Sequence, residues 1–248
     1  TTAKLVEKAG INAILVGDSL GMTMMGYDTT LPVTMEDMIH HGAAVARGAK
    51  NALVVVDMPF MSYQSSVYDA VVNAGRLMKE ARANAVKLEG GVEVADRIRA
   101  IVDCQIPVCA HIGLTPQGIN ALGGFKVQGK TADSARKLLE DAHAVEEAGA
   151  FAVVLEAIPA ELAARVSAEL TIPTIGIGAG AGCDGQVLVN QDMLGMFHDF
   201  TPKFVRRFAE VGDVMLDAYR AYDAAVKDGT FPAAEHTYAA PAGVLETL

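Results

Sequence analysis

The sequence has few cysteines and no long apolar runs. Its three cysteines, Cys104, Cys109 and Cys183, form no Cys-x-x-Cys pair and are odd in number. A disulfide framework is therefore not expected, and the pattern favours reduced thiols in a cytoplasmic protein. No uninterrupted apolar stretch approaches the roughly 18 residues of a membrane-spanning helix. No signal peptide is visible either. We therefore predict a cytoplasmic protein with no membrane partner.

Positive charge is also scarce. The 248 residues include 20 Lys and Arg against 30 Asp and Glu, which gives a net charge of −10. Such a chain repels a phosphate backbone, so we do not expect a nucleic-acid partner. Fixed-period repeats, Pro-rich linkers and long charge runs are lacking too. A chain of this length can bury a large core, and we predict one domain over residues 1–248.

The sequence is instead rich in short runs of Val, Ile and Leu, separated by Ala-rich segments with helical spacing such as 69–80 and 131–147. Near-continuous apolar runs are typical of strands that are covered on both faces. Their alternation with helices predicts a parallel sheet and, at this length, a (β/α)8 TIM barrel. The predicted strands are residues 11–18, 52–57, 85–89, 106–111, 151–156, 173–178 and 185–190.

The eighth strand of such a barrel is not visible. Residues 1–10 already have the pattern of a helix that ends at Gly10, and the sequence does not begin with Met. We therefore expect that a first strand precedes Thr1 and is missing from this sequence.

Ionisable side chains end five of the predicted strands. Because the carboxyl ends of parallel strands meet at one rim of a barrel, we expect these groups to lie together. The residues concerned are Asp18, Asp57, Lys87 with Glu89, His111 and Glu156.

Asp18 and Asp57 end consecutive strands, so they are expected to be neighbours about 5 Å apart. Each could simply cap the following turn. Two carboxylates that close repel each other unless a proton or a cation lies between them, and hard oxygen ligands favour Mg²⁺ over zinc.

Each of the other rim residues has a structural and a functional interpretation. Lys87 and Glu89 point to one side of their strand, where they could form an internal ion pair or hold a substrate anion and a metal-bound water. His111 could be a buried structural histidine or part of the site. Glu156 could be a general acid or base, or the salt-bridge partner of Lys87.

The glycine-rich run 174–184 follows a late strand. It could cradle a phosphate, leave room for a bulky ligand, or only allow a tight passage from strand to loop. The spacing does not reproduce a dinucleotide-binding fingerprint.

Motifs along the whole chain resemble the ketopantoate hydroxymethyltransferase family, whose members are also called 3-methyl-2-oxobutanoate hydroxymethyltransferases. The similar segments are residues 16–22, 29–34, 56–60, 86–91, 111–117, 123–129, 176–180, 183–189 and 231–237.

The resemblance implies a barrel of the phosphoenolpyruvate mutase and isocitrate lyase type. It further implies transfer of a hydroxymethyl group from 5,10-methylenetetrahydrofolate to 2-oxoisovalerate through a Mg²⁺-stabilised enolate, on the path to pantothenate and coenzyme A. Homo-oligomers, commonly decamers, are typical of the family. Members carry a first strand ahead of the position of Thr1, and without that strand the barrel would be open.

The resemblance also assigns roles to the rim residues. It implies that Asp18 and Asp57 bind Mg²⁺ and contact the substrate, with Glu89 near the metal waters. Ser19, Lys87 and His111 would be further substrate contacts, and Glu156 the catalytic base. Two rival hypotheses remain: another Mg²⁺-dependent 2-oxo-acid lyase or mutase, which would not need folate, and a non-catalytic ligand-binding barrel.

Overall fold

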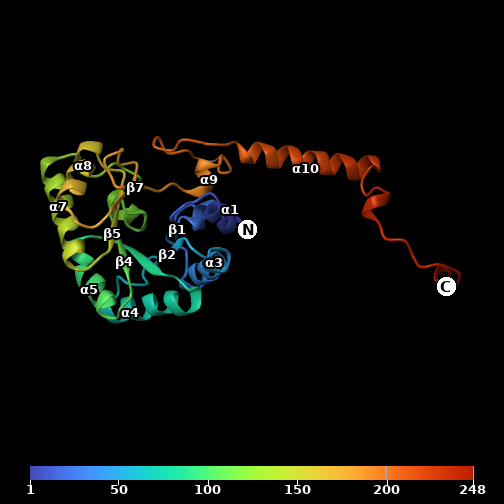
Figure 1. The fold of residues 1–248 in the computed structure, drawn as a ribbon. Helices are drawn as coiled ribbons and strands as arrows, with labels where there is room; N and C mark the ends of the chain where they lie inside the picture. Colours follow the sequence, from blue (N-terminus) through green and yellow to red (C-terminus); the bar gives the residue numbers. More distant parts are fainter. Residues whose placement is uncertain (199, 248) are drawn as a thin grey trace. The chain divides into compact units, whose positions relative to one another are not determined.

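A sheet of seven parallel strands forms the centre of the fold in the computed structural model, which describes residues 1–198 and 200–247. The strands pair in chain order, as predicted for successive βα units, and Figure 1 shows them at the centre of the first 188 residues. They are β1 (Ala13–Val16), β2 (Leu53–Asp57), β3 (Ala85–Glu89), β4 (Val108–Gly113), β5 (Ala152–Glu156), β6 (Thr174–Ile177) and β7 (Gly185–Gln186).

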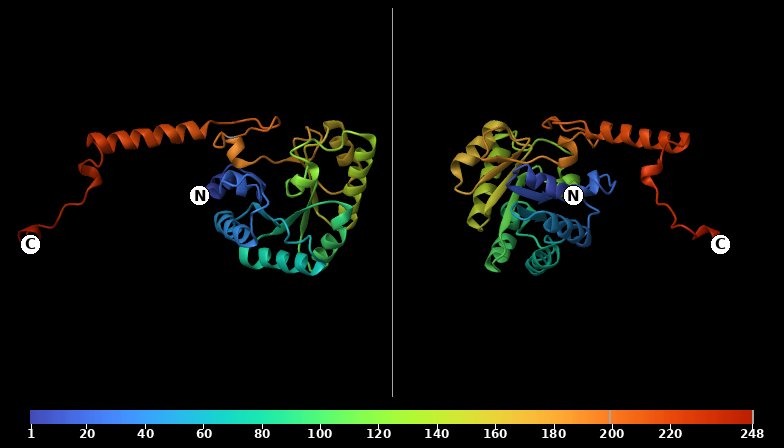
Figure 2. Two further views of the ribbon diagram at one scale, coloured as in Figure 1. Left: turned by 180° about the vertical axis from the view of Figure 1, so that it is seen from behind. Right: turned by 45° about the vertical axis from the view of Figure 1, so that its right-hand side comes forward.

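Helices follow the strands and lie outside them, as the views in Figure 1 and Figure 2 agree. Two of the long helices begin at reciprocal capping boxes, formed by Thr34 with Asp37 and by Thr131 with Ser134. The helices of this part are α1 (Thr2–Lys8), α2 (Leu20–Thr23), α3 (Met35–Gly48), α4 (Val67–Arg76), α5 (Ala95–Asp103), α6 (Ile119–Leu122), α7 (Ala132–Glu147) and α8 (Ala160–Glu169).

Two predicted elements differ in detail. The helix predicted over 69–80 begins earlier, because Ser66 caps α4 by accepting a hydrogen bond from the Asp69 amide, and it continues as a π-helical turn over Leu77–Ala81. The strand predicted over 185–190 is wrong in length. Only Gly185 and Gln186 pair with β6, and residue 190 already begins a short helix.

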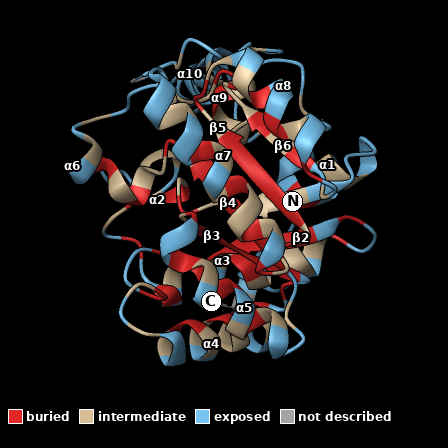
Figure 3. Ribbon diagram, turned by 90° about the vertical axis from the view of Figure 1, so that its left-hand side faces the viewer, coloured by how far each residue is buried: buried red, intermediate tan, exposed pale blue. Residues whose placement is uncertain are grey.

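The two faces of the sheet carry different apolar clusters. Alternate strand residues such as Val56, Val86 and Leu88 pack with residues of the surrounding helices in the main core. The opposite face carries a smaller cluster, made of Val55, Ala85, Cys109, Ala152 and Val154. Figure 3 shows the buried strands at the centre and the exposed surfaces on the helices. Because strand side chains alternate between faces, the small cluster marks the inner wall of the sheet.

The chain divides into two compact units, Thr1–Leu188 and Val189–Leu248. The second unit contains α9 (Asn190–Met193), α10 (Val211–Asp228), short 3₁₀ turns at Ala234–His236 and Leu245–Thr247, and irregular segments. The single domain over residues 1–248 therefore stays a prediction. No helix within the described ranges combines the length and apolar character that crossing a membrane requires. All three cysteines are free, as expected.

Candidate active site

The strand register brings the predicted rim residues together on the inner face of the sheet. Asp57 pairs directly with Lys87 across β2 and β3, and Glu89 pairs with His111 across β3 and β4. These four side chains are buried, and Glu156 at the end of β5 is half-buried. They belong to the same face as the small apolar cluster, because each lies two or four residues from one of its members.

One predicted position is corrected by the structure. His111 does not end its strand, because β4 continues to Gly113. The histidine therefore lies one layer below the rim, with Glu156 registered opposite Gly113 rather than opposite the imidazole.

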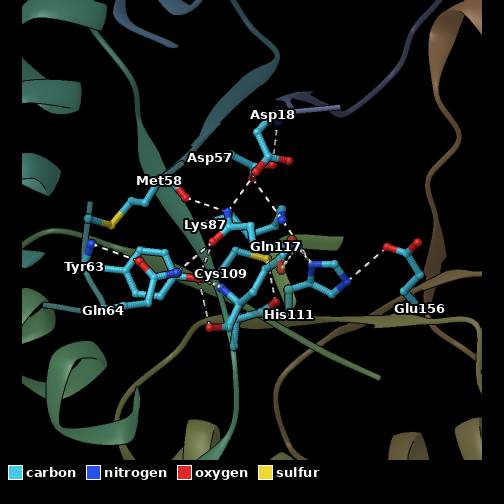
Figure 4. A network of polar contacts seen from close by, with 12 residues as sticks. Asp18, Asp57, Met58, Tyr63, Gln64, Lys87, Cys109, His111, Gln117 and Glu156 are labelled. Carbon is cyan, nitrogen blue, oxygen red and sulfur yellow. Dashed lines mark hydrogen bonds and ion pairs between the residues drawn. The ribbon is translucent and has the colours of Figure 1, made fainter. Parts of the chain in front are cut away.

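Asp18 and Asp57 are neighbours, as predicted (Figure 4). The Asp18 amide donates a hydrogen bond of 3.0 Å to Asp57 Oδ2, and Asp57 Oδ1 lies 3.0 Å from Lys87 Nζ. Apart from this ion pair, Asp57 Oδ1 has no partner among the contacts of the described residues. The backbone at Gly17 lies close to both groups, since a Cβ there would lie 3.2 Å from the hydroxyl of Ser19 and 3.5 Å from Asp57 Oδ2. Ser19 therefore stands beside the two aspartates, and its side chain caps no helix.

His111 connects the remaining charged groups. Its Nδ1 lies 3.2 Å from Lys87 Nζ and 3.5 Å from Glu89 Oε1, and its Nε2 lies 3.1 Å from Glu156 Oε2. The ion pair of Lys87 is thus with Asp57, and Glu156 contacts the histidine. The two salt bridges considered from the sequence, between Lys87 and either glutamate, are not the pairs that the structure forms.

The charges of this cluster perturb one another strongly. Burial and the neighbouring Asp57 carboxylate raise the pKa of Asp18 to about 8. Burial and Lys87 act to lower the pKa of His111, but the carboxylates of Glu156 and Glu89 outweigh them and raise it to about 9. Burial also opposes the charge on Lys87, yet Asp57 and Glu89 raise its pKa above the usual range. Both bases are therefore cationic at neutral pH.

The pKa values of the two other buried acids move in opposite directions. Burial raises the pKa of Asp57 against the opposing effect of Lys87. For Glu89, burial acts in the same direction, but the contact with His111 outweighs it and lowers the pKa. A bound cation would favour the ionised form of Asp18, and with all four carboxylates ionised the cluster would have an excess of two negative charges over its two cations.

This donor set fits a divalent cation. Asp18 and Asp57 offer hard carboxylate oxygens on adjacent side chains, and a cation of charge two would balance the excess. Within residues 1–198 and 200–247, no three His, Cys, Asp or Glu side chains are grouped closely enough to share a metal. At most two protein carboxylates would therefore bind it directly. The Glu89 carboxylate is occupied by the Gln117 amide and His111, which suits contact through a water.

Two residues of this network were not identified from the sequence. Gln117 follows β4 in a 3₁₀ turn and donates to Asp18 Oδ2 at 2.8 Å, while the hydroxyl of Tyr63 lies 2.8 Å from Gln117 Oε1. Both side chains are buried. Their loops give no periodic signal, and the available cue is that Gln117 ends the family-like segment 111–117, which begins at His111.

The glycine-rich run has a packing role in the structure. A Cβ at Gly180 would lie 2.5 Å from Ala160 Cβ, and one at Gly182 would lie 2.7 Å from Ala164 Cβ. These two glycines let the loop after β6 lie directly on α8, a packing role that was not among the roles considered from the sequence.

The backbone beside Glu156 is unusual. Ala157 has a left-handed conformation with φ of 48°, which non-glycine residues seldom adopt. Its amide donates to Ile177 O at 2.9 Å and its carbonyl accepts from the Gln128 amide at 2.9 Å. These bonds fix the turn that directs the chain away from Glu156.

Comparisons with known proteins agree with this geometry. The model of the family "Ketopantoate hydroxymethyltransferase" matches residues 1–234. The chain is 66% identical to 3-methyl-2-oxobutanoate hydroxymethyltransferase of Clostridium novyi and 65% identical to that of Enterococcus faecalis, covering 100% of this chain and 90% of each relative.

Solved structures with a similar fold include a phosphonopyruvate hydrolase, with a TM-score of 0.59 at 14% identity over 98% of this chain and 85% of the other. An oxaloacetate acetylhydrolase has a TM-score of 0.57 at 15% identity over 98% and 81%. These similarities confirm the fold class predicted from the sequence.

Proposed function

Because the chain belongs to the ketopantoate hydroxymethyltransferase family, we propose that it transfers a hydroxymethyl group from 5,10-methylenetetrahydrofolate to 3-methyl-2-oxobutanoate, with Mg²⁺ as cofactor. The observation that carries this proposal is the buried cluster in which two adjacent aspartates, one lysine and a histidine–glutamate pair share one face of the sheet. The product, ketopantoate, is a precursor of pantothenate and coenzyme A.

The substrate is a 2-oxo acid, and its negative charge must be held in a cluster that is itself acidic. Lys87 and His111 are the two cations available, and Ser19 adds a hydroxyl beside the aspartates. Asp18 and Asp57 would hold Mg²⁺, with Glu89 near its waters. When bound, Mg²⁺ would polarise the keto and carboxylate oxygens and make the proton on C3 more acidic.

Glu156 is the group best placed to take that proton. Its side chain is 16% exposed, so one carboxylate oxygen can face a substrate while Oε2 contacts His111 Nε2. The cationic imidazole orients the carboxylate and balances its charge. After proton transfer, C3 holds an electron pair that forms the new C–C bond to the methylene carbon carried by the folate. Water supplies the hydroxyl oxygen of the product, both carbon–nitrogen bonds of the methylene group break, and tetrahydrofolate leaves with its two nitrogens protonated by the C3 proton and one proton of the water. Removing one charged group that stabilises the transition state typically raises the activation barrier by about 3 kcal/mol.

The test follows the C3 proton of 3-methyl-2-oxobutanoate by NMR in D₂O. With Mg²⁺ but without folate, the enzyme should exchange this proton for deuterium, and with methylenetetrahydrofolate it should form ketopantoate. Glu156→Gln should slow exchange by about 10²- to 10⁴-fold. If Asp57→Ala still exchanged the C3 proton at the normal Mg²⁺-dependent rate, Asp57 would not be a metal ligand. Turnover of the oxo acid without folate would favour a lyase or mutase instead.

The family resemblance also supports a homo-oligomer in the cytoplasm. Sedimentation velocity of the full chain tests the first point, and a monomer at micromolar concentration would contradict it.

A further inference from the structure

Gln117 makes a complete set of side-chain hydrogen bonds inside the candidate site. Its Nε2 donates to Asp18 Oδ2 at 2.8 Å and to Met58 O at 2.9 Å. Its Oε1 accepts from the hydroxyl of Tyr63 at 2.8 Å and from Gln64 Nε2 at 2.9 Å. A carboxamide can donate two hydrogen bonds and accept two, so every capacity of this side chain is used.

The polarity of these contacts fixes which way the amide points. Asp18 and the Met58 carbonyl are acceptors, so the nitrogen must face them. Tyr63 is 1% exposed, and its hydroxyl accepts from the Glu89 amide at 3.0 Å. Two acceptors face its single proton, Gln117 Oε1 at 2.8 Å and the Glu89 carbonyl at 3.1 Å, and the contact with Gln117 is the shorter. Tyr63 thereby sets the orientation in which Gln117 presents a donor to Asp18.

The same side chain joins the ends of three strands of the sheet. Gln117 follows β4, Asp18 follows β1 and Met58 follows β2. Asp18 lies 99 residues away in the chain, so the contact depends entirely on the folded sheet. A carboxylate held by one buried donor keeps one orientation, and its other oxygen remains available to a ligand.

We propose that Gln117 is a positioning residue for the cation site: it holds the Asp18 carboxylate in the orientation that binds the divalent metal, and Tyr63 holds Gln117. The inference rests on the proposed function, in which Asp18 is a metal ligand, and adds two residues to which that function assigns no role.

The test measures Mn²⁺ binding by electron paramagnetic resonance, as a readout separate from turnover. Gln117→Met keeps the length of the side chain and the backbone bond from the Gln117 amide to Glu89, but removes the donor to Asp18. Its dissociation constant for Mn²⁺ should rise about 10- to 100-fold. Tyr63→Phe keeps the ring but removes the hydroxyl that contacts Gln117 and the Glu89 backbone, and it should raise the dissociation constant by a smaller factor of about five.

Gln186→Met is the matched control, because Gln186 is an exposed residue at the sheet edge whose Nε2 bonds only the Gly180 carbonyl among the described contacts. It should bind Mn²⁺ as the unaltered protein does. Thermal unfolding of all variants is recorded in parallel, and binding is measured well below every melting temperature.

The outcomes separate this inference from the proposed function. If the unaltered protein binds no Mn²⁺, the metal role itself fails. If it binds Mn²⁺ and both Gln117→Met and Tyr63→Phe keep its affinity, the positioning role is overturned, even when their melting temperatures fall. If Gln117→Met does not fold, Tyr63→Phe decides by the same criterion.

Discussion

Asp18→Asn should make the metal-free protein more stable while removing a ligand of the proposed cation site. The pKa of Asp18 is raised from 3.8 to about 8 by burial and by the Asp57 carboxylate, so an ionised Asp18 opposes folding. Asparagine carries no charge, and its carbonyl can still accept the hydrogen bond from Gln117 Nε2. The substitution therefore removes the electrostatic cost of an ionised side chain and keeps the hydrogen bond from Gln117.

The magnitude follows from the difference in proton affinity between the two states. At neutral pH, about three pH units separate the unfolded pKa from the solution pH, and each unit is worth about 1.4 kcal/mol, so the cost is at most about 4 kcal/mol. The folded pKa lies above the unfolded one. The cost is therefore absent below pH 3.8, grows between 3.8 and about 8, and is constant above that.

Urea unfolding in EDTA at about pH 5, 7 and 8.5 measures this dependence. The advantage of Asp18→Asn over the unaltered protein should widen from the first pH to the last. Saturating Mg²⁺ should narrow or reverse this advantage if the proposed site binds the cation through the Asp18 carboxylate. Asp103→Asn, at an exposed position, is the control and should show no such trend. A variant that is less stable than the unaltered protein at all three pH values would refute the reasoning.

Three further outcomes are expected. Lys87→Met should lower the free energy of unfolding by about 3–5 kcal/mol, because it leaves Asp57 buried without its cation. Urea unfolding measures this change, and unchanged stability would show that the ion pair is not maintained in solution. Thr34→Ala should cost about 1 kcal/mol in thermal unfolding, since it removes the capping box of α3, while turnover stays unaltered. Chelation of divalent metal should abolish formation of ketopantoate and addition of Mg²⁺ should restore it, with unchanged circular dichroism; full activity in the chelator would contradict the metal role.

The strands and the shared position of the site residues were accessible from sequence because both depend on local pattern. Continuous apolar runs identify buried parallel strands, and alternation along each strand places Lys87 with Glu89 on one face. The parallel arrangement then requires Asp18, Asp57 and Glu156 to meet at one edge. The length of the apolar runs and the alternation of side chains along each strand were enough for these conclusions.

The pairing of charges was not accessible, because it depends on register. A shift of one residue between β3 and β4 would move His111 away from Glu89, and nothing local in either strand sets that alignment. The end of β7 was missed for a similar reason. Its Val-rich run reads as a strand, but β6 offers it only two paired positions. Gln117 and Tyr63 lie in loops, where function arises only from contacts between distant segments.

The left-handed backbone at Ala157 limits how this enzyme could be redesigned. A β-branched residue is strongly disfavoured at positive φ, whereas glycine, asparagine and aspartate tolerate it. A mutant library intended to change substrate choice by varying the residues after Glu156 would therefore lose its Val, Ile and Thr members at this position to misfolding. Restricting position 157 to Ala, Gly and Asn would keep most of the library screenable and direct the diversity to the neighbouring positions.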